Sequence, residues 1–279
     1  MFNDIHLTSS HLLPLYGKRI LITAPRNYAS RLCQHIINKG GLPILMPTIE
    51  TCLLTDYNEL DTALKQIEKF DWITFTSRKG IEAFFYRLNC LDLPIYILKN
   101  CQLSAIGKDT ERLLDFGLNV DLIPTEASPA GIIAELSKIP NIDNKSVLVP
   151  VPKVVGIPEP NIVPNFILGL NKLGMKVTSV ITYTTRCLDE NIYEIELNLI
   201  RQNKIDVIAF SSTGEIEAFL NMINSKRDYD NCVIGCFGPY TAANAKKLGI
   251  NVSIVAKDFR SFEGFAEAIA TFFAKEGQV

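Results

Sequence analysis

The chain has 279 residues, of which 47% are hydrophobic, and a formal net charge of −2. This length suits two domains of roughly 100–130 residues, and the composition supports packed cores rather than disorder. The near-neutral charge excludes a basic field that would attract nucleic acid or an anionic membrane. We also expect no membrane segment, because no apolar run reaches the roughly 18–20 residues that span a bilayer.

In chain order, short apolar runs alternate with helical patterns. The runs are rich in Val, Ile and Leu and lack clean polar alternation, which predicts strands that are buried on both faces. The predicted strands are 18–23, 71–76, 101–106, 119–124, 145–150, 206–211, 232–237 and 251–256. The helical patterns include 28–39, 78–88, 109–116, 213–224, 239–248 and 261–275. This alternation predicts an α/β fold with parallel sheets and right-handed crossovers.

An internal repeat accompanies this alternation. The segment FDWITFTSRKGIEAF (70–84) returns as IDVIAFSSTGEIEAF (205–219). Further matched pairs are 106–120 with 237–252, 128–136 with 261–269, and 18–23 with 145–150. The repeat is far longer than the roughly 20–50 residues of a solenoid unit, so it predicts two similar domains. Two matched strand-turn-helix units on facing domains can hold one ligand between them.

Two β-prone runs, 42–51 and 177–185, break the strand-helix rhythm at equivalent places in the two halves. They could pair as a ladder that joins the domains, in which case the chain leaves its first domain after about residue 41 and returns near residue 185. A tandem split near residue 142 fits the repeat equally well. The pattern of residues alone does not choose between these arrangements.

The cysteines and histidines argue against metal and disulfide chemistry. Seven cysteines are scattered without a CxxC pair, and all three histidines (His6, His11 and His35) lie near the N-terminus. We therefore expect reduced thiols in a cytosolic type of compartment and no metal cluster or Ser–His dyad elsewhere. Residues 1–16 resemble neither a secretory signal nor an Arg-rich transit peptide and are predicted to form a loose tail.

Hydroxyl side chains follow two matched strands at the point where helices begin. Thr76 and Ser77 occupy this position in one half, and Ser211 and Ser212 occupy it in the other. Such hydroxyls cap a helix, while its free N–H groups and positive dipole end can bind an anion. Ligands of parallel α/β sheets bind at these carboxyl strand ends. Capping alone is the alternative, but the same chemistry in both halves favours anion binding.

The next strand-to-helix junction repeats this chemistry with glycine and threonine. Gly107 with Thr110 and Gly238 with Thr241 combine close backbone approach with a hydroxyl at a helix start. The GKDT segment is not the end of a P-loop, because position 102 is glutamine where a P-loop needs glycine. Since no GxGxxG motif is present either, a nucleotide or dinucleotide site has little support.

Five further residues are candidates for binding or chemistry. Ser128 and Ser261 begin a third matched pair of helices and could each supply another anion contact. Arg26 and Lys153 place one cation each in matching loops after strands, where a solvated surface charge is the alternative. Tyr183, in ITYTT, could donate a proton or a hydrogen bond to a leaving group, or it could simply pack.

In this order and spacing, these features resemble the uroporphyrinogen-III synthase family from about Lys18 to Phe273. The resemblance is carried by ITAPR, DWITFTSRKGIEAF, IGKDT, VPVPK, ITYTT, DVIAFSSTGEIEAF and CFGPYTAANAKKLGINV. TAPRNYA, PTIET and EPNIVPNF look closest to cyanobacterial and plastid-type members. The resemblance implies two flavodoxin-like domains joined by a two-stranded β connector. The implied boundaries are 1–41 plus 186–279, 52–174, and connector strands at 42–51 and 175–185.

The resemblance also implies a function. It is that of a cofactor-free lyase that cyclises hydroxymethylbilane to uroporphyrinogen III, losing water and inverting the terminal ring through a spiro intermediate. Tyr183 then assists departure of the substrate's hydroxyl group. The substrate is bound by the hydroxyl residues that follow the matched strands (Thr76, Ser77, Ser211 and Ser212) and by Thr110 and Thr241. Ala24 stands where many members of the family have threonine. This difference affects how far the Arg26 side chain can reach. The implied protein is a cytoplasmic monomer, or a stromal one in a photosynthetic eukaryote, that could transiently contact hydroxymethylbilane synthase.

Two other functions fit parts of the pattern. A non-catalytic two-lobed module for a small anion would share the matched helix starts, but the free cysteines and the lack of a secretion signal argue against it. A sugar-nucleotide transferase would need a basic diphosphate cluster or a DxD motif, and the sequence shows neither.

Overall fold

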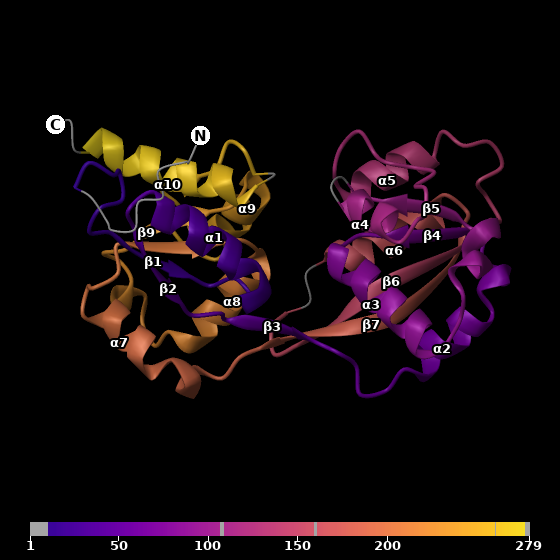
Figure 1. The fold of residues 1–279 in the computed structure, drawn as a ribbon, viewed down its shortest axis with the longest axis horizontal. Coiled ribbons are helices and arrows are strands. Elements are labelled where there is room, and N and C mark those ends of the chain that lie inside the picture. The colour runs from indigo at the N-terminus through magenta and orange to yellow at the C-terminus, as the bar shows by residue number, and fades with distance from the viewer. Residues whose placement is uncertain (1–10, 107–108, 159–160, 260, 277–279) are drawn as a thin grey trace, which may run out of the picture. The chain divides into compact units, whose positions relative to one another are not determined.

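The computed structural model describes residues 11–106, 109–158, 161–259 and 261–276. The chain divides into two compact units (Figure 1). Unit 1 comprises Met1–Glu50, Gly156–Pro158 and Arg186–Val279, and unit 2 comprises Thr51–Val155 and Glu159–Thr185. The chain therefore enters unit 2 from unit 1 and later returns to unit 1.

Unit 1 contains a five-stranded sheet in the order β10-β9-β8-β1-β2. Its strands are β1 (Arg19–Ile22), β2 (Leu42–Leu45), β8 (Val207–Phe210), β9 (Val233–Cys236) and β10 (Ile254–Val255). All four neighbouring pairs are parallel. Numbered by their order within the unit, the strands run 2-1-3-4-5, which is the flavodoxin-like arrangement.

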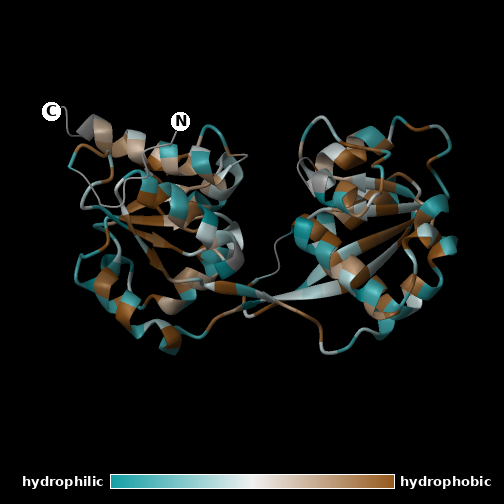
Figure 2. Cartoon of the chain, in the orientation of Figure 1, coloured by the Kyte–Doolittle hydropathy of each residue, from teal (hydrophilic) through white to brown (hydrophobic). Residues whose placement is uncertain are grey.

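Helices cover both faces of this sheet. They are α1 (Arg26–Asn38), α7 (Glu194–Arg201), α8 (Thr213–Met222), α9 (Pro239–Lys247) and α10 (Phe262–Glu276), with 3₁₀ segments at Glu190–Tyr193 and Lys226–Asp228. In β1, Ile20 and Ile22 pack with α1 and α10, whereas Leu21 packs with α7, α8 and α9. Both faces are buried, and for this reason the strand sequences show no polar alternation. Figure 2 shows these strands as largely hydrophobic ribbons.

Unit 2 repeats this plan around a second sheet, in the order β3-β7-β6-β4-β5. Its strands are β3 (Ile49–Cys52), β4 (Trp72–Phe75), β5 (Gln102–Ala105), β6 (Ser146–Val155) and β7 (Lys176–Cys187). β4 is parallel to both β5 and β6. Its helices are α2 (Asn58–Lys65), α3 (Arg78–Cys90), α4 (Asp109–Asp115), α5 (Pro129–Leu136) and α6 (Ile162–Lys172), with 3₁₀ segments at Ile67–Lys69 and Ile95–Asn100.

Two of the predicted extended segments take a different form. Residues 119–124 form only an isolated parallel bridge between Leu122 and Ser104 of β5, in the place that β10 has beside β9. The run 42–51 is divided into β2, which pairs with β1, and β3, which lies beside β7. The interruption contains Pro47, which has no N–H to donate to a ladder.

Candidate functional site

The start of α3 in unit 2 brings together two of the predicted residues. Ser77 is the N-cap of this helix, and its hydroxyl oxygen accepts a hydrogen bond from the Gly80 N–H at 3.0 Å. The same oxygen lies 3.1 Å from the hydroxyl of Tyr183, which β7 supplies. Tyr183 is only 9% exposed, and Thr76 beside the cap is half-buried. The structure therefore joins a helix N-terminus and a tyrosine hydroxyl through one serine.

A cationic cluster that sequence reasoning missed surrounds the first turn of α3. Glu82 pairs with Lys79 at 2.7 Å and with Arg78 at 3.4 Å, and Arg112 of α4 lies 3.9 Å from it. Burial would raise the pKa of Glu82, but the hydrogen bond and charge of Lys79, together with the two arginines, lower it overall. Arg112 also pairs with Asp115 at 3.1 Å, so three cations stand against two carboxylates and the cluster keeps an excess of one positive charge.

The other predicted residues of unit 2 lie at helix starts or on a strand. Ser128 is the N-cap of α5: it accepts from the Gly131 N–H at 3.0 Å and donates to Glu126 Oε1 at 2.7 Å. Thr110, in the first turn of α4, is buried. Gly107 lies outside the described residues.

The loop position predicted for Lys153 is wrong. Lys153 lies within β6, which runs to Val155 because the long neighbouring strand β7 gives its backbone groups partners. Its side chain is exposed and borders a cavity of about 210 Å³ that also contacts Asp56 and Glu59. Two carboxylates in the same cavity compete with any anionic ligand for this lysine.

In unit 1, a buried carboxylate occupies the matching helix start. Glu215 Oε1 accepts from the hydroxyls of Ser211 and of Ser212, the latter at 3.0 Å. Its Oε2 accepts from the Ser211 N–H at 2.7 Å and from the Thr23 hydroxyl at 2.9 Å. Glu215 is 1% exposed. The two predicted serines therefore bind a carboxyl group in the structure, and that group belongs to the protein itself.

Sequence reasoning missed Glu215, although a signal for it was present. Ser212 and Glu215 form the S-x-x-E pattern of a capping box, with Ser212 as the N-cap of α8. Burial raises the pKa of Glu215, while the hydrogen bonds from Ser211, Thr23 and Ser212 oppose that rise. Its repeat partner in unit 2 is Gly80. The start of α3 thus has no side chain where α8 carries a carboxylate.

Three further predicted residues of unit 1 lie at helix starts. Gly238 precedes α9, and Thr241 in its first turn is buried and donates to the Ser211 carbonyl at 3.5 Å. Ser261 precedes α10, accepts from the Gly264 N–H at 3.1 Å and donates to Asp258 Oδ2 at 3.0 Å. Ser261 therefore repeats the contacts of Ser128 in unit 2.

Arg26 begins α1 rather than lying in a loop, because the fixed backbone of Pro25 places the helix start directly after it. Its side chain is exposed and interacts with the Tyr193 hydroxyl. Burial raises the pKa of Tyr193, and the charge and hydrogen bond of Arg26 oppose that rise. Arg26 thus has a partner within unit 1.

The described part of the chain contains no group of three or more His, Cys, Asp or Glu residues that could hold a metal ion. All seven cysteines are free thiols. Among the described helices, none combines the length and the apolar character that crossing a membrane requires.

Comparisons with known proteins agree on one family. The model of the family described as uroporphyrinogen-III synthase HemD matches residues 30–265. The porphyrin biosynthesis protein HemD of Ruminiclostridium josui is 26% identical over 247 residues, which are 88% of this chain and 47% of that protein. The uroporphyrinogen-III synthases of Chlorobaculum parvum and Synechococcus elongatus are each 25% identical, with 98% and 96% of their lengths covered. The chain thus spans about half of the first relative and nearly all of the other two.

Solved structures support the same fold. A mutant uroporphyrinogen III synthase from Thermus thermophilus aligns with a TM-score of 0.65 at 15% identity, covering 91% of this chain and 99% of that one. A wild-type crystal form of the Thermus protein aligns with a TM-score of 0.53 at 16% identity. At these identities the likeness establishes the two-unit α/β architecture.

Proposed function

Because the chain belongs to the uroporphyrinogen-III synthase family, we propose that it closes hydroxymethylbilane to uroporphyrinogen III. The reaction releases one water and inverts the terminal ring through a spiro intermediate. The family match over residues 30–265 supports this assignment. The paired helix starts support it on physical grounds, since the substrate is a flexible chain with eight carboxylates that needs many separate anion contacts.

The observation that carries the proposal is the contact of Tyr183 with Ser77 at the start of α3. Ser77 already accepts a hydrogen bond from the Gly80 N–H, so its own proton is available to the oxygen of Tyr183. The phenol proton can then be donated to the hydroxyl group that leaves the bilane. We assign Tyr183 this role of assisting departure, and Ser77 the role of orienting it.

Loss of the hydroxyl gives an electron-poor azafulvene, which the substituted carbon of the last pyrrole attacks. A tyrosine that is 9% exposed donates its hydrogen bond in a partly dehydrated setting, where it is stronger than in water. Holding the two ends of the bilane close together lets closure with inversion outrun spontaneous closure. The main demands on the protein are therefore positioning and shielding of the reactive species.

For the substrate carboxylates, we propose contacts at Thr76, Ser77, Gly107, Thr110, Ser128 and Lys153 in unit 2, and at Arg26, Ser211, Ser212, Gly238, Thr241 and Ser261 in unit 1. The cations around Glu82 favour the α3 start, because three positive groups outnumber the carboxylates of Glu82 and Asp115 there. The carboxyl group of Glu215 already takes the Ser211 N–H and the hydroxyls of Ser211 and Ser212, which leaves fewer donors for an additional anion at the α8 start. We therefore expect the anion contacts of α3 to exceed those of α8 in strength.

The experiment that tests this function supplies freshly prepared hydroxymethylbilane and identifies the product after oxidation to the porphyrin. We expect the type III isomer. Only type I, from a chain shown to be folded by circular dichroism, would overturn the proposal. A monomeric state, a cytoplasmic or stromal location and a transient contact with hydroxymethylbilane synthase remain predictions from the resemblance.

A further inference from the structure

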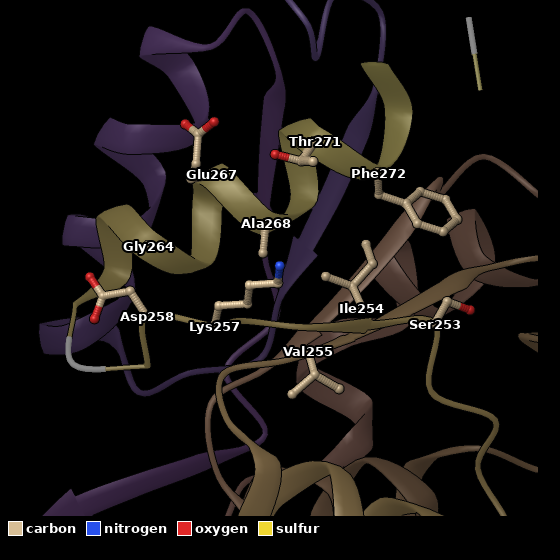
Figure 3. A pocket seen from close by; sticks show the side chains of 10 residues that line it. All are labelled: Ser253, Ile254, Val255, Lys257, Asp258, Gly264, Glu267, Ala268, Thr271 and Phe272. Atoms are coloured by element: carbon tan, nitrogen blue, oxygen red, sulfur yellow. The ribbon is translucent and has the colours of Figure 1, made fainter. Parts of the chain in front are cut away.

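A groove in unit 1 begins at Asp258 and Gly264, the partners of Ser261 at the start of α10, and extends along that helix. It has a volume of about 660 Å³ and is bounded by the edge strand β10 with the residues after it, and by α10 (Figure 3). Its apolar lining includes Ile254, Val255, Ala268 and Phe272. Figure 3 shows the Lys257 side chain reaching from the strand side toward Ala268 of the helix. A volume of roughly 300–1,000 Å³ with a few polar groups is typical of small-molecule sites.

Lys257 is the cation of this groove. Within the described part of the chain, its amine makes no ion pair or hydrogen bond, and the side chain is exposed. The two carboxylates that border the groove are engaged elsewhere. Glu267 pairs with Lys39 of α1, and Asp258 accepts from the Ser261 hydroxyl. The groove therefore offers an amine without a carboxylate partner among the described residues, beside an apolar surface.

In unit 2, side chains of the protein fill the equivalent gap, between the segment before α5 and that helix. There the Thr125 hydroxyl donates to Glu135 Oε1 at 3.4 Å, which links the segment before α5 to that helix. Lys138 donates to Glu135 Oε2 at 2.7 Å. In unit 2, a carboxylate of the chain thus joins the two sides of the gap and receives hydrogen bonds from both.

The two gaps can be compared residue by residue, because Ser128 and Ser261 make the same contacts in both units. Each caps the helix and donates to an acidic residue a few positions before it: Glu126, two positions before Ser128, or Asp258, three positions before Ser261. The residue preceding that acid is Thr125 in unit 2 and Lys257 in unit 1. Seven positions after each serine stand Glu135 and Ala268. At this gap unit 1 therefore has alanine where unit 2 has the carboxylate, and its amine comes from the strand side (Lys257) rather than from the helix side (Lys138).

We propose that the groove between β10 and α10 binds a small molecule with one carboxylate and an apolar body. The carboxylate pairs with Lys257 and takes the place that Glu135 has in unit 2, with Thr271 at the position of Lys138. The apolar body covers Ile254, Val255 and Phe272. Ala268 leaves room for the ligand where a longer side chain would enter the groove.

Octanoate is a suitable probe, and its binding can be followed by amide chemical-shift changes in the full-length chain. We expect saturable shifts at Lys257, Ala268 and Phe272. Ala268→Glu supplies the missing carboxylate from the helix, and Lys257→Thr removes the amine as in unit 2. Each should weaken octanoate binding by about tenfold or more, which corresponds to the loss of one charge-assisted hydrogen bond. Lys204→Thr, which removes an exposed lysine elsewhere in unit 1, is the charge-matched control and should bind octanoate normally.

Octanol, which has the same chain without the charge, should bind at least about tenfold more weakly than octanoate. Unchanged thermal unfolding of both groove variants would show that they fold. The proposal is overturned if octanoate causes no localised shifts, or if the two folded variants bind it as the parent chain does. It also fails if octanol binds as tightly as octanoate. None of these readouts depends on uroporphyrinogen formation, so the outcome is separate from that of the proposed function.

Discussion

Tyr183 is the residue on which the proposed chemistry depends. Its hydroxyl lies 3.1 Å from Ser77, although the two residues are 106 positions apart in the chain. The ITYTT segment indicated Tyr183 through the family resemblance, and the hydroxyl side chains at the end of the matched strand indicated Ser77. Neither pattern predicted their contact, because it depends on how β7 is placed relative to the start of α3. The two residues could thus be predicted from the sequence, whereas their contact could be found only from the folded structure.

We predict that Tyr183→Phe lowers turnover by about 10- to 100-fold, since it removes one donor to the leaving hydroxyl. Steady-state rates of uroporphyrinogen III formation would measure the effect. Tyr229→Phe is the matched control, because Tyr229 is also a buried tyrosine but lies in the core of unit 1. Normal turnover of a folded Tyr183→Phe chain would remove Tyr183 from the mechanism.

Glu215 shows how one residue changes a repeated site. Glu215→Ala leaves the hydroxyls of Thr23, Ser211 and Ser212 without their shared acceptor. We expect the free energy of unfolding to fall by about 2–4 kcal/mol at pH 4, as for other buried polar networks that lose a member. Urea denaturation measures this. Glu217→Ala serves as the control: burial raises the pKa of Glu217, and its buried Oε2 has no hydrogen-bond partner among the described residues, so its removal should cost little.

The effect of Glu215 should also depend on pH. Because burial raises its pKa in the folded state, its contribution to stability is complete below the unfolded value of about 4.3 and is lost as pH rises through the folded value. Glu215→Gln cannot ionise, so the stability of the parent chain relative to this variant should decline as pH rises from 4 to 8. A difference that is constant with pH, or that grows, would contradict the raised pKa.

At the scale of the elements, one motif recurs at the helix starts. Ser77, Ser128 and Ser261 each cap a helix and each accept from the N–H of a glycine three positions later. Only at α8 is that position a glutamate. The serines were visible in the sequence as matched hydroxyls. The role of the glycines could not be predicted from the sequence, because it depends on which backbone atoms lie above each helix start.

The glycine at the start of α5 gives a direct test. A Cβ at Gly131 would lie 2.1 Å from the Glu126 carbonyl oxygen, so Gly131→Ala must shift backbone and should destabilise the chain by about 2–3 kcal/mol. Gly80→Ala is the matched control, because its nearest contact is the Ser77 hydroxyl at 3.2 Å and it should cost less than about 1 kcal/mol. Chemical denaturation compares them. Equal costs would show that close backbone approach is not the reason for glycine at position 131.

The predicted strand ranges match the structure to different degrees, and the differences have physical causes. Strands with neighbours on both sides, such as β4 and β8, fall inside their predicted ranges because both faces are buried and the apolar run is continuous. At the sheet edges, 251–256 forms only the two-residue strand β10, and 119–124 forms a single bridge. Each of these two runs pairs on one side alone, with β9 or with β5, and only part of each run finds backbone partners there.

At the scale of the whole molecule, the repeat in the sequence is a repeat in topology. The order β10-β9-β8-β1-β2 in unit 1 matches the Leu122 bridge followed by β5-β4-β6-β7 in unit 2. The repeat could be predicted from matched segments such as 70–84 and 205–219. The sequence alone could not decide whether the chain passes from one unit to the other once or twice, because both paths give the same repeat.

Each unit has its own hydrophobic cores, so we predict that residues 51–185 fold as an independent fragment. The chain's single tryptophan, Trp72, is 2% exposed in unit 2 and packs against Val147, Val149 and Leu136. The fragment should show the same Trp72 emission maximum as the full chain and unfold cooperatively in urea. Solvent-exposed emission with no cooperative transition would contradict this.

The central claim is that the chain directs ring closure to the inverted isomer. The most direct measurement is the ratio of type III to type I uroporphyrinogen, formed from fresh hydroxymethylbilane as the concentration of the chain is raised. We predict that the ratio rises with chain concentration until type III dominates, and that heat-denatured chain leaves type I alone. A ratio that does not respond to folded chain would contradict it.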